Sequence, residues 1–454
     1  MSKTHIQDFT RGNISRQLFI FAWPLFLSNL LQVVYNMVDM MVVGQVVGST
    51  GLSAVSIANQ LIWFTTALCM GFTNAGQILI SQLIGAGKRE DLAKTIATVT
   101  ITVFSVAIFV TVAGFALTRP MLNLLKTPAE SYEEAVKYLH IVFLGTVFTF
   151  GYNLVSSIFR GIGDSRHPLI FVAIAAVSNL VLDIVAVVYL DWGVAGAALA
   201  TIFGQAVSLV ISTRYLYRNR VKLGFGEMKL RDFKADKACL GRLVRLGVPF
   251  ALQNAAITVS MLFVNRFINE YGLTASATFG TGTRIEQIPW IIINGIMMGC
   301  ATMVGQNMGA GKIDRMKQVV TISAWICAGT AVLFMALFQL FPREIYSFFT
   351  PDADVLELAP KFMLALVISL PATCMMCPYQ AFLEGIGNAA LVLIIALLDG
   401  FVSRIAISLF LAYVCDMGLM GWFLGYGLAA YVNTILCVIY YYSGVWKKRK
   451  SLVA

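Results

Sequence analysis

The sequence predicts an all-α polytopic membrane protein, with twelve transmembrane helices in two six-helix lobes related by pseudo-two-fold symmetry along the membrane normal. Three observations support this prediction: an apolar composition, long apolar segments separated by loops of alternating charge, and an internal duplication. Of the 454 residues, 58% are hydrophobic and 12% are charged, whereas a soluble protein has roughly 25% charged residues. Such a composition is typical of a chain that lies largely within a bilayer.

Apolar segments of membrane-spanning length run along the whole chain. They reach about 20 residues without the alternation of a barrel strand, so they indicate helices. The first follows a polar start and is too long for a signal peptide, so we expect it to act as its own insertion signal. The expected spans lie near residues 16–43, 53–84, 93–118, 135–159, 168–190, 194–217, 243–268, 278–308, 317–341, 358–383, 390–414 and 418–443.

Lysine and arginine gather in alternate loops. They occur before the first span, in GKREDLAK, RGIGDSRH and GKIDRMK after the second, fourth and eighth spans, and in the tail KKRK, whereas the other loops are acidic or bare. By the positive-inside rule, both termini are cytoplasmic. We therefore attribute the net charge of +10 to membrane topology and expect no nucleic-acid partner. The basic stretch from Arg214 to Lys237 is expected to be a cytoplasmic linker that acts as a topological retention signal, with contact to anionic membrane lipids as the further possibility.

The chain contains an internal repeat. AWPLFLSNLLQ matches GVPFALQNAAI, LIGAGKREDLAK matches NMGAGKIDRMKQ, and FRGIGDSRHPLI matches LEGIGNAALVLI, so Pro24 pairs with Pro249. Each half has an even number of spans, so the halves share one orientation, as in two-lobed transporters. The expected domains are an amino-terminal lobe at 1–217, a basic linker at 218–242 and a carboxyl-terminal lobe at 243–454.

Two short motifs suggest chemistry that the rest of the sequence does not support. GAGK lacks the spacing of a phosphate-binding loop, and we interpret both copies as cytoplasmic turns. CMMC, from Cys374 to Cys377, lacks a second cysteine pair or a histidine and lies in an apolar segment, so its thiols are expected to be buried. We expect no cofactor, and energy for transport would come from an ion gradient unless a partner chain supplies ATP.

The first span carries a polar face with one carboxylate. Asn29, Gln32, Asn36 and Asp39 are spaced three, four and three residues apart, which places them on one side of a helix. A charge at mid-bilayer depth costs about 2.5 to 3.5 kcal/mol on insertion scales and marks a functional site by default. This face should therefore point into the protein.

The fifth and sixth spans repeat this arrangement. Asn179 and Asp183 lie one turn apart on the fifth span, Thr201 lies on the sixth, and Asn153 adds an amide on the fourth. Two carboxylates with amide and hydroxyl oxygens can hold Na⁺, and a close, desolvated pair can also carry protons. The alternative is a structural role, in which hydrogen-bonded polar groups hold the helices together.

The second half lacks these acids. The repeat places Val264 and Ile407 opposite Asp39 and Asp183, so ion coupling is expected on one side only. Asp399 and Arg404 lie five residues apart on the eleventh span, which turns them about 140° away from each other on an α-helix. We therefore expect each to need its own partner, in a structural role or, as the alternative, at a substrate site.

These features together resemble the multidrug and toxic compound extrusion (MATE) family, and within it the DinF-like branch. The resemblance covers essentially the whole chain and implies export of organic cations and amphipathic drugs in exchange for H⁺ or Na⁺, with no enzymatic activity. Matching positions imply an ion-coupling site, which includes the possible Na⁺ site, and a helix bend near Pro24. The implied coupling residues are Asp39, Asn179, Asp183 and Thr201, and the substrate cavity residues are Gln32, Tyr35, Asn36 and Asn153.

The same resemblance sets the alternatives. NorM-like relatives use acids on the seventh and tenth helices that this chain lacks. Their absence favours H⁺ as the coupling ion, and Na⁺ bound in the amino-terminal lobe is the alternative. A flippase for lipid-linked oligosaccharide or polysaccharide, from the same superfamily, is the second candidate function. We expect a multi-pass monomer in the cell membrane of a prokaryote, the inner membrane where there are two.

Overall fold

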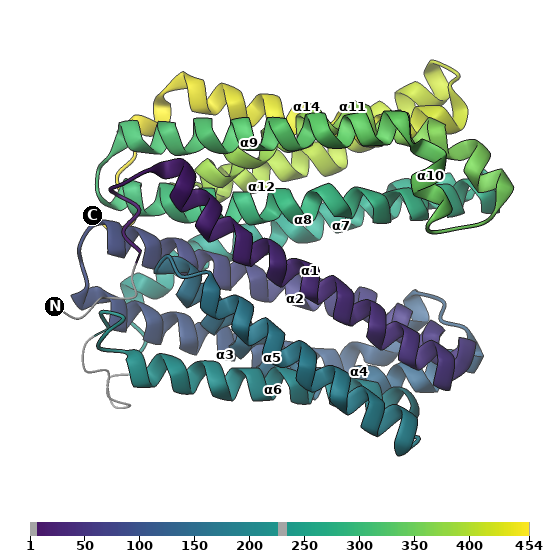
Figure 1. Cartoon of the computed structure of the whole chain (residues 1–454), viewed down its shortest axis with the longest axis horizontal. Coiled ribbons are helices and arrows are strands. Elements are labelled where there is room, and N and C mark those ends of the chain that lie inside the picture. Colours follow the sequence, from purple (N-terminus) through teal and green to yellow (C-terminus); the bar gives the residue numbers. More distant parts are fainter. Residues whose placement is uncertain (1–6, 226–233, 454) are drawn as a thin grey trace. The chain divides into compact units, whose positions relative to one another are not determined.

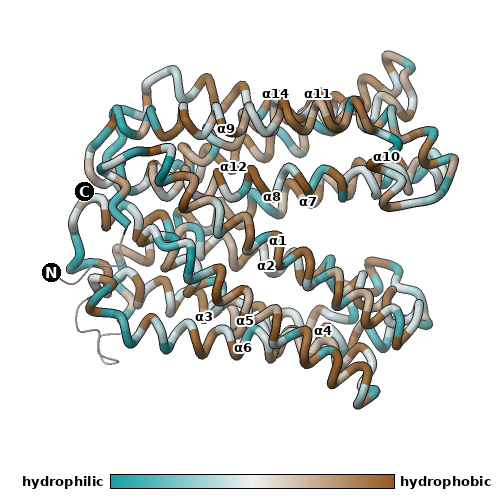
Figure 2. The backbone as a smooth tube through the Cα atoms, in the orientation of Figure 1, coloured by the Kyte–Doolittle hydropathy of each residue, from teal (hydrophilic) through white to brown (hydrophobic). Residues whose placement is uncertain are grey.

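The computed structural model describes residues 7–225 and 234–453, and every regular element in those ranges is helical (Figure 1). Twelve helices in these ranges are long and apolar enough to cross a membrane, which confirms the expected number of spans. Apolar residues run along their lengths, and hydrophilic residues gather at their ends (Figure 2). The basic stretch from Arg214 to Lys237 lies partly outside the described ranges.

The first six spans are formed by seven elements. They are α1 (Ile14–Val46), α2 (Gly48–Gly85), α3 (Glu90–Leu124), α4 (Ala129–Gly161), α5 (Arg166–Asp183) with its continuation η1 (Ile184–Tyr189), and α6 (Gly193–Asn219). The helices extend a few residues beyond most of the expected ranges.

The second six spans follow the same order with more interruptions. They are α7 (Lys237–Asn269), α8 (Leu273–Gly309), α9 (Ile313–Leu340), α11 (Ala353–Gly385), the composite of α12 (Ala389–Leu397), η3 (Leu398–Arg404), α13 (Ile405–Leu409) and η4 (Phe410–Val414), and α14 (Gly418–Ser443). Two short helices, α10 (Pro342–Ser347) and η5 (Val445–Lys448), lie outside the spans.

The chain divides into two compact units whose boundaries fall inside helices. Among the described residues, the first unit contains Gln7, Asp8 and the chain from Trp23 to Ala251, and the second contains Phe9–Ala22 and residues 252–453. The boundaries therefore cross α1 immediately before Pro24 and cross α7 just after Pro249. The two prolines that the repeat aligns mark the places where a helix passes from one unit to the other.

Hydrogen bonds hold the start of α1 within the second unit. The Phe9 N–H donates to Gln306 Oε1 at 2.9 Å, and the Phe9 carbonyl accepts from Arg315 Nε at 2.8 Å. In the first unit, the chain just before α7 is held in a similar way, because the Asp236 N–H donates to Thr98 Oγ1 at 3.0 Å. Each unit thus includes the first turns of a helix that continues in the other.

The first unit is built around α2 and α4. Figure 1 shows α3, α4, α5 and α6 running along one another, and a buried core forms where side chains of α1, α2, α4 and α6 meet. Its members include Val43, Ala54, Phe143 and Ala197, all 1% exposed or less. The second unit packs α8, α9 and α14 around α11, with Phe362 at 0% exposure among aromatic neighbours.

Four repeat-related turns end α2, α4, α8 and α11 in the same way. After α2, the Lys88 N–H bonds the Leu83 carbonyl and the Gly87 N–H bonds the Ile84 carbonyl, with Gly87 at φ 71°. This pair of bonds is a Schellman motif, which needs a left-handed residue that glycine supplies at little cost. The structure confirms that both GAGK segments are turns.

A π-helix changes the relationship between Asp399 and Arg404. Both lie in η3, where the hydrogen bonds span five residues and the turn is wider than in an α-helix. Arg404 Nη2 therefore lies 3.5 Å from Asp399 Oδ2. The prediction that the two side chains point apart and need separate partners is wrong, because it assumed α-helical geometry throughout the span.

Candidate functional site

Asp39 is buried in the last third of α1. Its side chain is 7% exposed, and its Oδ1 atom has no hydrogen-bond partner among the described residues. Asn36, one turn earlier, is exposed, and Gln32 and Asn29 are half-buried. Of the polar face predicted on this helix, only the carboxylate is fully enclosed.

Asp183 is the second buried carboxylate of the first unit. It ends α5, directly before the π-helix η1, and is 1% exposed. Neither of its oxygens has a hydrogen-bond partner in the described part of the chain. Asp183 and Asp39 are close enough for their charges to interact, so the structure brings together the two acids that the sequence singled out.

Asn179 and Thr201 lie beside this pair. Asn179 is 4% exposed and its Nδ2 atom donates to Thr201 Oγ1 at 3.4 Å, a long hydrogen bond between α5 and α6. The same hydroxyl donates to the Ala197 carbonyl at 3.0 Å. The amide oxygen of Asn179 and the Thr201 hydroxyl oxygen supply polar atoms next to the carboxylates.

A glycine allows α5 and α6 to approach this closely. A Cβ atom on Gly204 would lie 2.7 Å from the Ala175 carbonyl oxygen and 3.1 Å from the Asn179 nitrogen. One turn further along α6, Ser208 Oγ donates to the Phe171 carbonyl at 2.8 Å. These contacts fix the position of Asn179 relative to Thr201.

Tyr138 of α4 also belongs to the site, although the sequence did not identify it. Its side chain is 2% exposed, its hydroxyl lies beside Thr201, and the charges of Asp39 and Asp183 both act on it. A tyrosine in an apolar helix is more often packed in the core, so spacing alone gives no signal for this position.

The remaining predicted residues form a neighbouring polar group. Tyr35 of α1 lies near both Asp39 and Tyr152, and Gln32 lies beside the Tyr152 hydroxyl. Asn153 instead bonds its own helix, with Nδ2 donating to the Thr149 carbonyl at 2.9 Å. Tyr35 therefore lies next to Asp39, and Gln32 adjoins it through Tyr152, whereas Asn153 bonds its own helix and Asn36 is exposed.

Pro24 lies inside α1, fifteen residues before Asp39 and next to the boundary between the units. The proline has no N–H to donate, and its own carbonyl accepts from Ser28 Oγ at 2.8 Å. This placement suits a point of bending.

The arrangement of these groups is chemically suited to the uptake of a cation. Two buried carboxylates with oxygens that lack hydrogen-bond partners in the described part of the chain repel each other and are expensive in a low-dielectric interior, and a bound positive charge lowers that energy. The partnerless oxygens of Asp39 and Asp183, with Asn179 and Thr201, suit Na⁺ as a donor set. No cluster of three histidine, cysteine or acidic side chains suited to a metal occurs in the described ranges.

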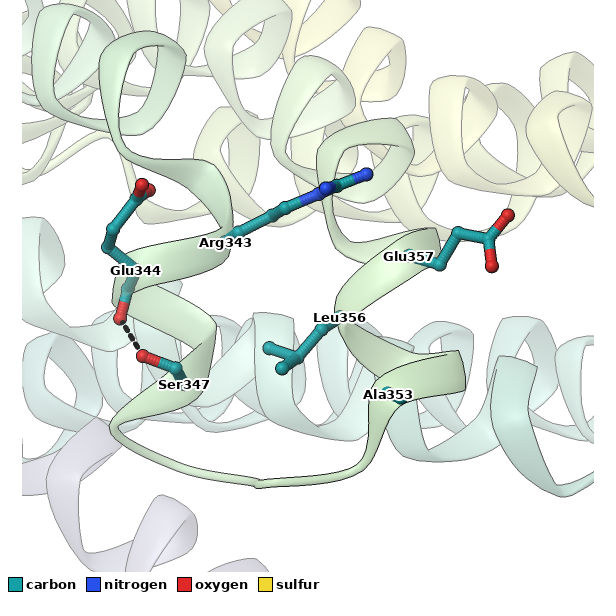
Figure 3. A pocket seen from close by; sticks show the side chains of 6 residues that line it. All are labelled: Arg343, Glu344, Ser347, Ala353, Leu356 and Glu357. Carbon is teal, nitrogen blue, oxygen red and sulfur yellow. Dashed lines mark hydrogen bonds between the residues drawn. The ribbon is translucent and has the colours of Figure 1, made fainter.

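Two open grooves lie outside this site. One of about 380 Å³, lined by Met40, Met41, Gly44, Gln45 and Leu52, follows Asp39 along α1 and α2. The other, of about 540 Å³, lies between α10 and α11, and Figure 3 shows Arg343, Glu344 and Glu357 at its margin with Ser347 bonded to the Glu344 carbonyl. Neither is lined by a buried carboxylate.

One carboxylate of the second unit, Glu286, is not predicted by the sequence patterns described above. Glu286 lies on α8, inside the expected eighth span, and Tyr426 Oη donates to its Oε2 atom at 2.6 Å. An acid within a predicted membrane span is the signal that could have identified it.

Comparison with known proteins gives a consistent result. The MatE family model matches residues 24–185 and 249–433, one stretch in each repeat. The probable multidrug resistance protein YpnP of Bacillus subtilis (strain 168) is 28% identical over 98% of both chains. The multidrug export protein MepA of Staphylococcus haemolyticus (strain JCSC1435) is 25% identical over 87% of this chain and 86% of that protein.

Solved structures share the fold. A MATE protein in a bent conformation superposes with a TM-score of 0.89 at 21% identity, over 97% of this chain and 98% of the other. A MOP superfamily transporter from Pyrococcus furiosus superposes with a TM-score of 0.90 at 21% identity, over 97% and 98% of the two chains. The two-lobed helical architecture expected from the sequence is therefore the one observed in these proteins.

Proposed function

The chain belongs to the MatE family of multi-pass membrane transporters, and we propose that it is a secondary active antiporter that exports cationic or amphipathic organic compounds in exchange for H⁺ or Na⁺. The relatives reported above are named as multidrug resistance and multidrug export proteins, that is, transporters and not enzymes. The coupling ion and the substrate class of this chain are our inference.

The observation that supports the proposal most strongly is the carboxylate pair of the first unit. Asp39 and Asp183 come from different helices and are near enough for their charges to interact, and Asp39 Oδ1 and both Asp183 oxygens are buried without a hydrogen-bond partner among the described residues. Structural carboxylates in a membrane protein are usually paired or hydrogen-bonded, because an unpaired buried charge is costly. A pair left without partners is suited to exchange a cation.

The exchange of an organic cation for H⁺ or Na⁺ follows from the negative charge of the carboxylate pair. When the pair is free of bound cations, its negative charge favours an organic cation in the same unit. Binding of H⁺ or Na⁺ at Asp39 and Asp183, with Asn179 and Thr201 as neighbouring donors, neutralises the site and favours release. Because one negative site cannot favour both cations at once, the two are transported in opposite directions by alternating access.

The proposal includes the membrane topology and the oligomeric state of the protein. We propose that the termini are cytoplasmic, that the protein works as a monomer in the cell membrane, and that the basic residues near Arg214 contact anionic lipid. The assignment to the DinF-like branch stays a prediction, as does a bend of α1 near Pro24.

The test is efflux of tetraphenylphosphonium from proteoliposomes under an imposed pH gradient or an imposed Na⁺ gradient. We expect one gradient to drive efflux in the wild type and to identify the coupling ion. If neither gradient moves the compound, the antiporter proposal fails. Translocation of a fluorescent lipid-linked oligosaccharide by the same vesicles would then favour the flippase.

A further inference from the structure

A second group of buried charges lies in the second unit. Glu286 of α8 accepts a hydrogen bond from Tyr426 of α14, Arg404 bonds Asp399 within η3, and Asn433 Nδ2 lies 3.5 Å from Asp399 Oδ2. The Arg404 guanidinium carbon lies 5.2 Å from the centre of the Tyr426 ring, and its charge acts on Glu286. We call Glu286, Asp399, Arg404, Tyr426 and Asn433 the α8–η3–α14 cluster.

The cluster has more negative than positive charge. Its two carboxylates face one guanidinium, and that guanidinium is bonded to Asp399. Asp399 and Arg404 are 4% and 9% exposed, whereas Glu286 is only half-buried. Glu286 is thus the more accessible acid, and its carboxylate accepts a hydrogen bond from the neutral Tyr426 hydroxyl while the guanidinium of the cluster is bonded to Asp399.

Buried atoms without partners occur within the cluster. Asp399 Oδ1 and Arg404 Nε make no hydrogen bond in the described part of the chain, and neither does Ser408 Oγ, one turn beyond Arg404. Two other titratable groups lie nearby: the Cys437 thiol of α14 donates to Asn433 Oδ1 at 3.4 Å, and the Tyr346 hydroxyl of α10 donates to the Thr278 carbonyl, two turns from Glu286 on α8. A cluster that served only to join helices would be expected to satisfy its buried atoms.

The duplication does not account for the cluster. The repeat aligns Glu286 with Ile62, Asp399 with Ala175 and Arg404 with Leu180, none of which is charged. It aligns η4 with η1, but the residues of the first half that correspond to η3 lie in the regular helix α5. The second unit therefore has an additional π-helical segment at the point where it carries charges, and such segments are frequent at functional sites.

We propose that Glu286 is a second cation-exchange carboxylate, which takes up one small monovalent cation, H⁺ or Na⁺, in the second unit. Arg404 neutralises Asp399 and leaves Glu286 as the acid that exchanges, and Tyr426 holds its carboxylate in place. A small ion is the ligand class because the cluster is tightly packed by Phe279 and Phe362, whose rings lie 5.4 Å apart, with Phe279 5.5 Å from Tyr426. This inference rests on the proposed antiport and would give each unit its own cation site.

The test is cation release when tetraphenylphosphonium binds to the purified full-length protein in detergent. A pH indicator in weakly buffered solution counts released H⁺, and displacement of radioactive Na⁺ counts Na⁺, so the two arms distinguish the ions. Fluorescence measures binding of the compound independently. We expect Glu286→Gln to bind the compound but to release fewer cations than the wild type. Asp39→Asn should still release the cation held at Glu286, and the double variant should release none.

The matched control is Glu384→Gln, which neutralises another acid of the second unit outside the cluster, where Gln380 Nε2 donates to Glu384 Oε1 at 3.1 Å. It is expected to release as many cations as the wild type. The inference is overturned if Glu286→Gln releases the wild-type number, binds no compound, or loses no more than Glu384→Gln. Failure of the antiporter proposal looks different, because the wild type itself would then release no cation.

Discussion

Arg404 and Asp399 face each other across one turn of the π-helix η3, with 3.5 Å between Nη2 and Oδ2 and with side chains 11% and 5% exposed. Removal of one member of such a pair leaves an uncompensated buried charge, which costs about 3 to 5 kcal/mol. We expect Arg404→Gln to lower the thermal unfolding midpoint in detergent. The double variant Arg404→Met with Asp399→Leu should recover much of the loss, because it removes both charges.

A melting curve of Arg404→Gln that coincides with the wild type would show that the pair contributes nothing to stability. Size-exclusion chromatography before and after heating separates unfolding from aggregation.

Gly204 sets the distance between α5 and α6 at the first-unit site. In Gly204→Ala, the added methyl group meets the Ala175 carbonyl at 2.7 Å, so the helices must separate and the bond from Asn179 to Thr201 is lost. Overpacking of this kind costs about 1 to 3 kcal/mol. We expect lower thermal stability and weaker binding of the coupling cation. Gly329→Ala on α9, where nothing lies within 4 Å, is the control, and equal effects of both variants would refute the account.

Tyr138 is expected to contribute to cation binding through its hydroxyl. Tyr138→Phe keeps the ring in its packed position and removes one hydrogen-bonding group, worth about 1 kcal/mol or roughly fivefold in affinity. The affinity for the coupling cation is measured by titrating H⁺ or Na⁺ and recording the release of bound substrate. Tyr132→Phe, which removes an exposed hydroxyl from the same helix, should leave the affinity unchanged. If the two variants behave alike, Tyr138 has only a packing role.

The two prolines at the unit boundaries are expected to matter for movement more than for binding. A proline inside a helix removes a backbone hydrogen bond and permits a bend, and Pro24 and Pro249 occupy equivalent places on α1 and α7. We expect Pro24→Ala and Pro249→Ala to slow transport while substrate affinity stays near the wild-type value. Pro371→Ala, inside α11 and away from both boundaries and both proposed sites, serves as the comparison. Unchanged transport rates in both boundary variants would count against bending at these points.

Much of the fold was predictable because it depends on composition and length. The apolar segments gave the twelve spans, and the match between the GAGK copies gave turns whose Schellman geometry the structure confirms. The unit boundaries inside α1 and α7 were not predictable, because they depend on tertiary packing and not on a change in composition.

The site was predictable only in part. The pairing of Asp39 with Asp183 followed from the rarity of acids in apolar helices, and Asn179 followed from its one-turn spacing. Tyr138 comes from a distant helix and has no spacing relation to the acids, so only the folded chain brings it there. The Asp399–Arg404 pair was missed because a π-helical turn cannot be recognised from α-helical periodicity.

If Asp39 binds the coupling cation, transport should depend on its charge, and this is tested by comparing Asp39→Asn with Asp191→Asn in proteoliposomes. Asp191 is an exposed acid of the same unit outside the helices, in a left-handed conformation that asparagine also adopts. Gradient-driven efflux of tetraphenylphosphonium should be lost in Asp39→Asn and retained in Asp191→Asn. Efflux by Asp39→Asn at the wild-type rate under the same gradient would show that Asp39 does not bind the coupling cation.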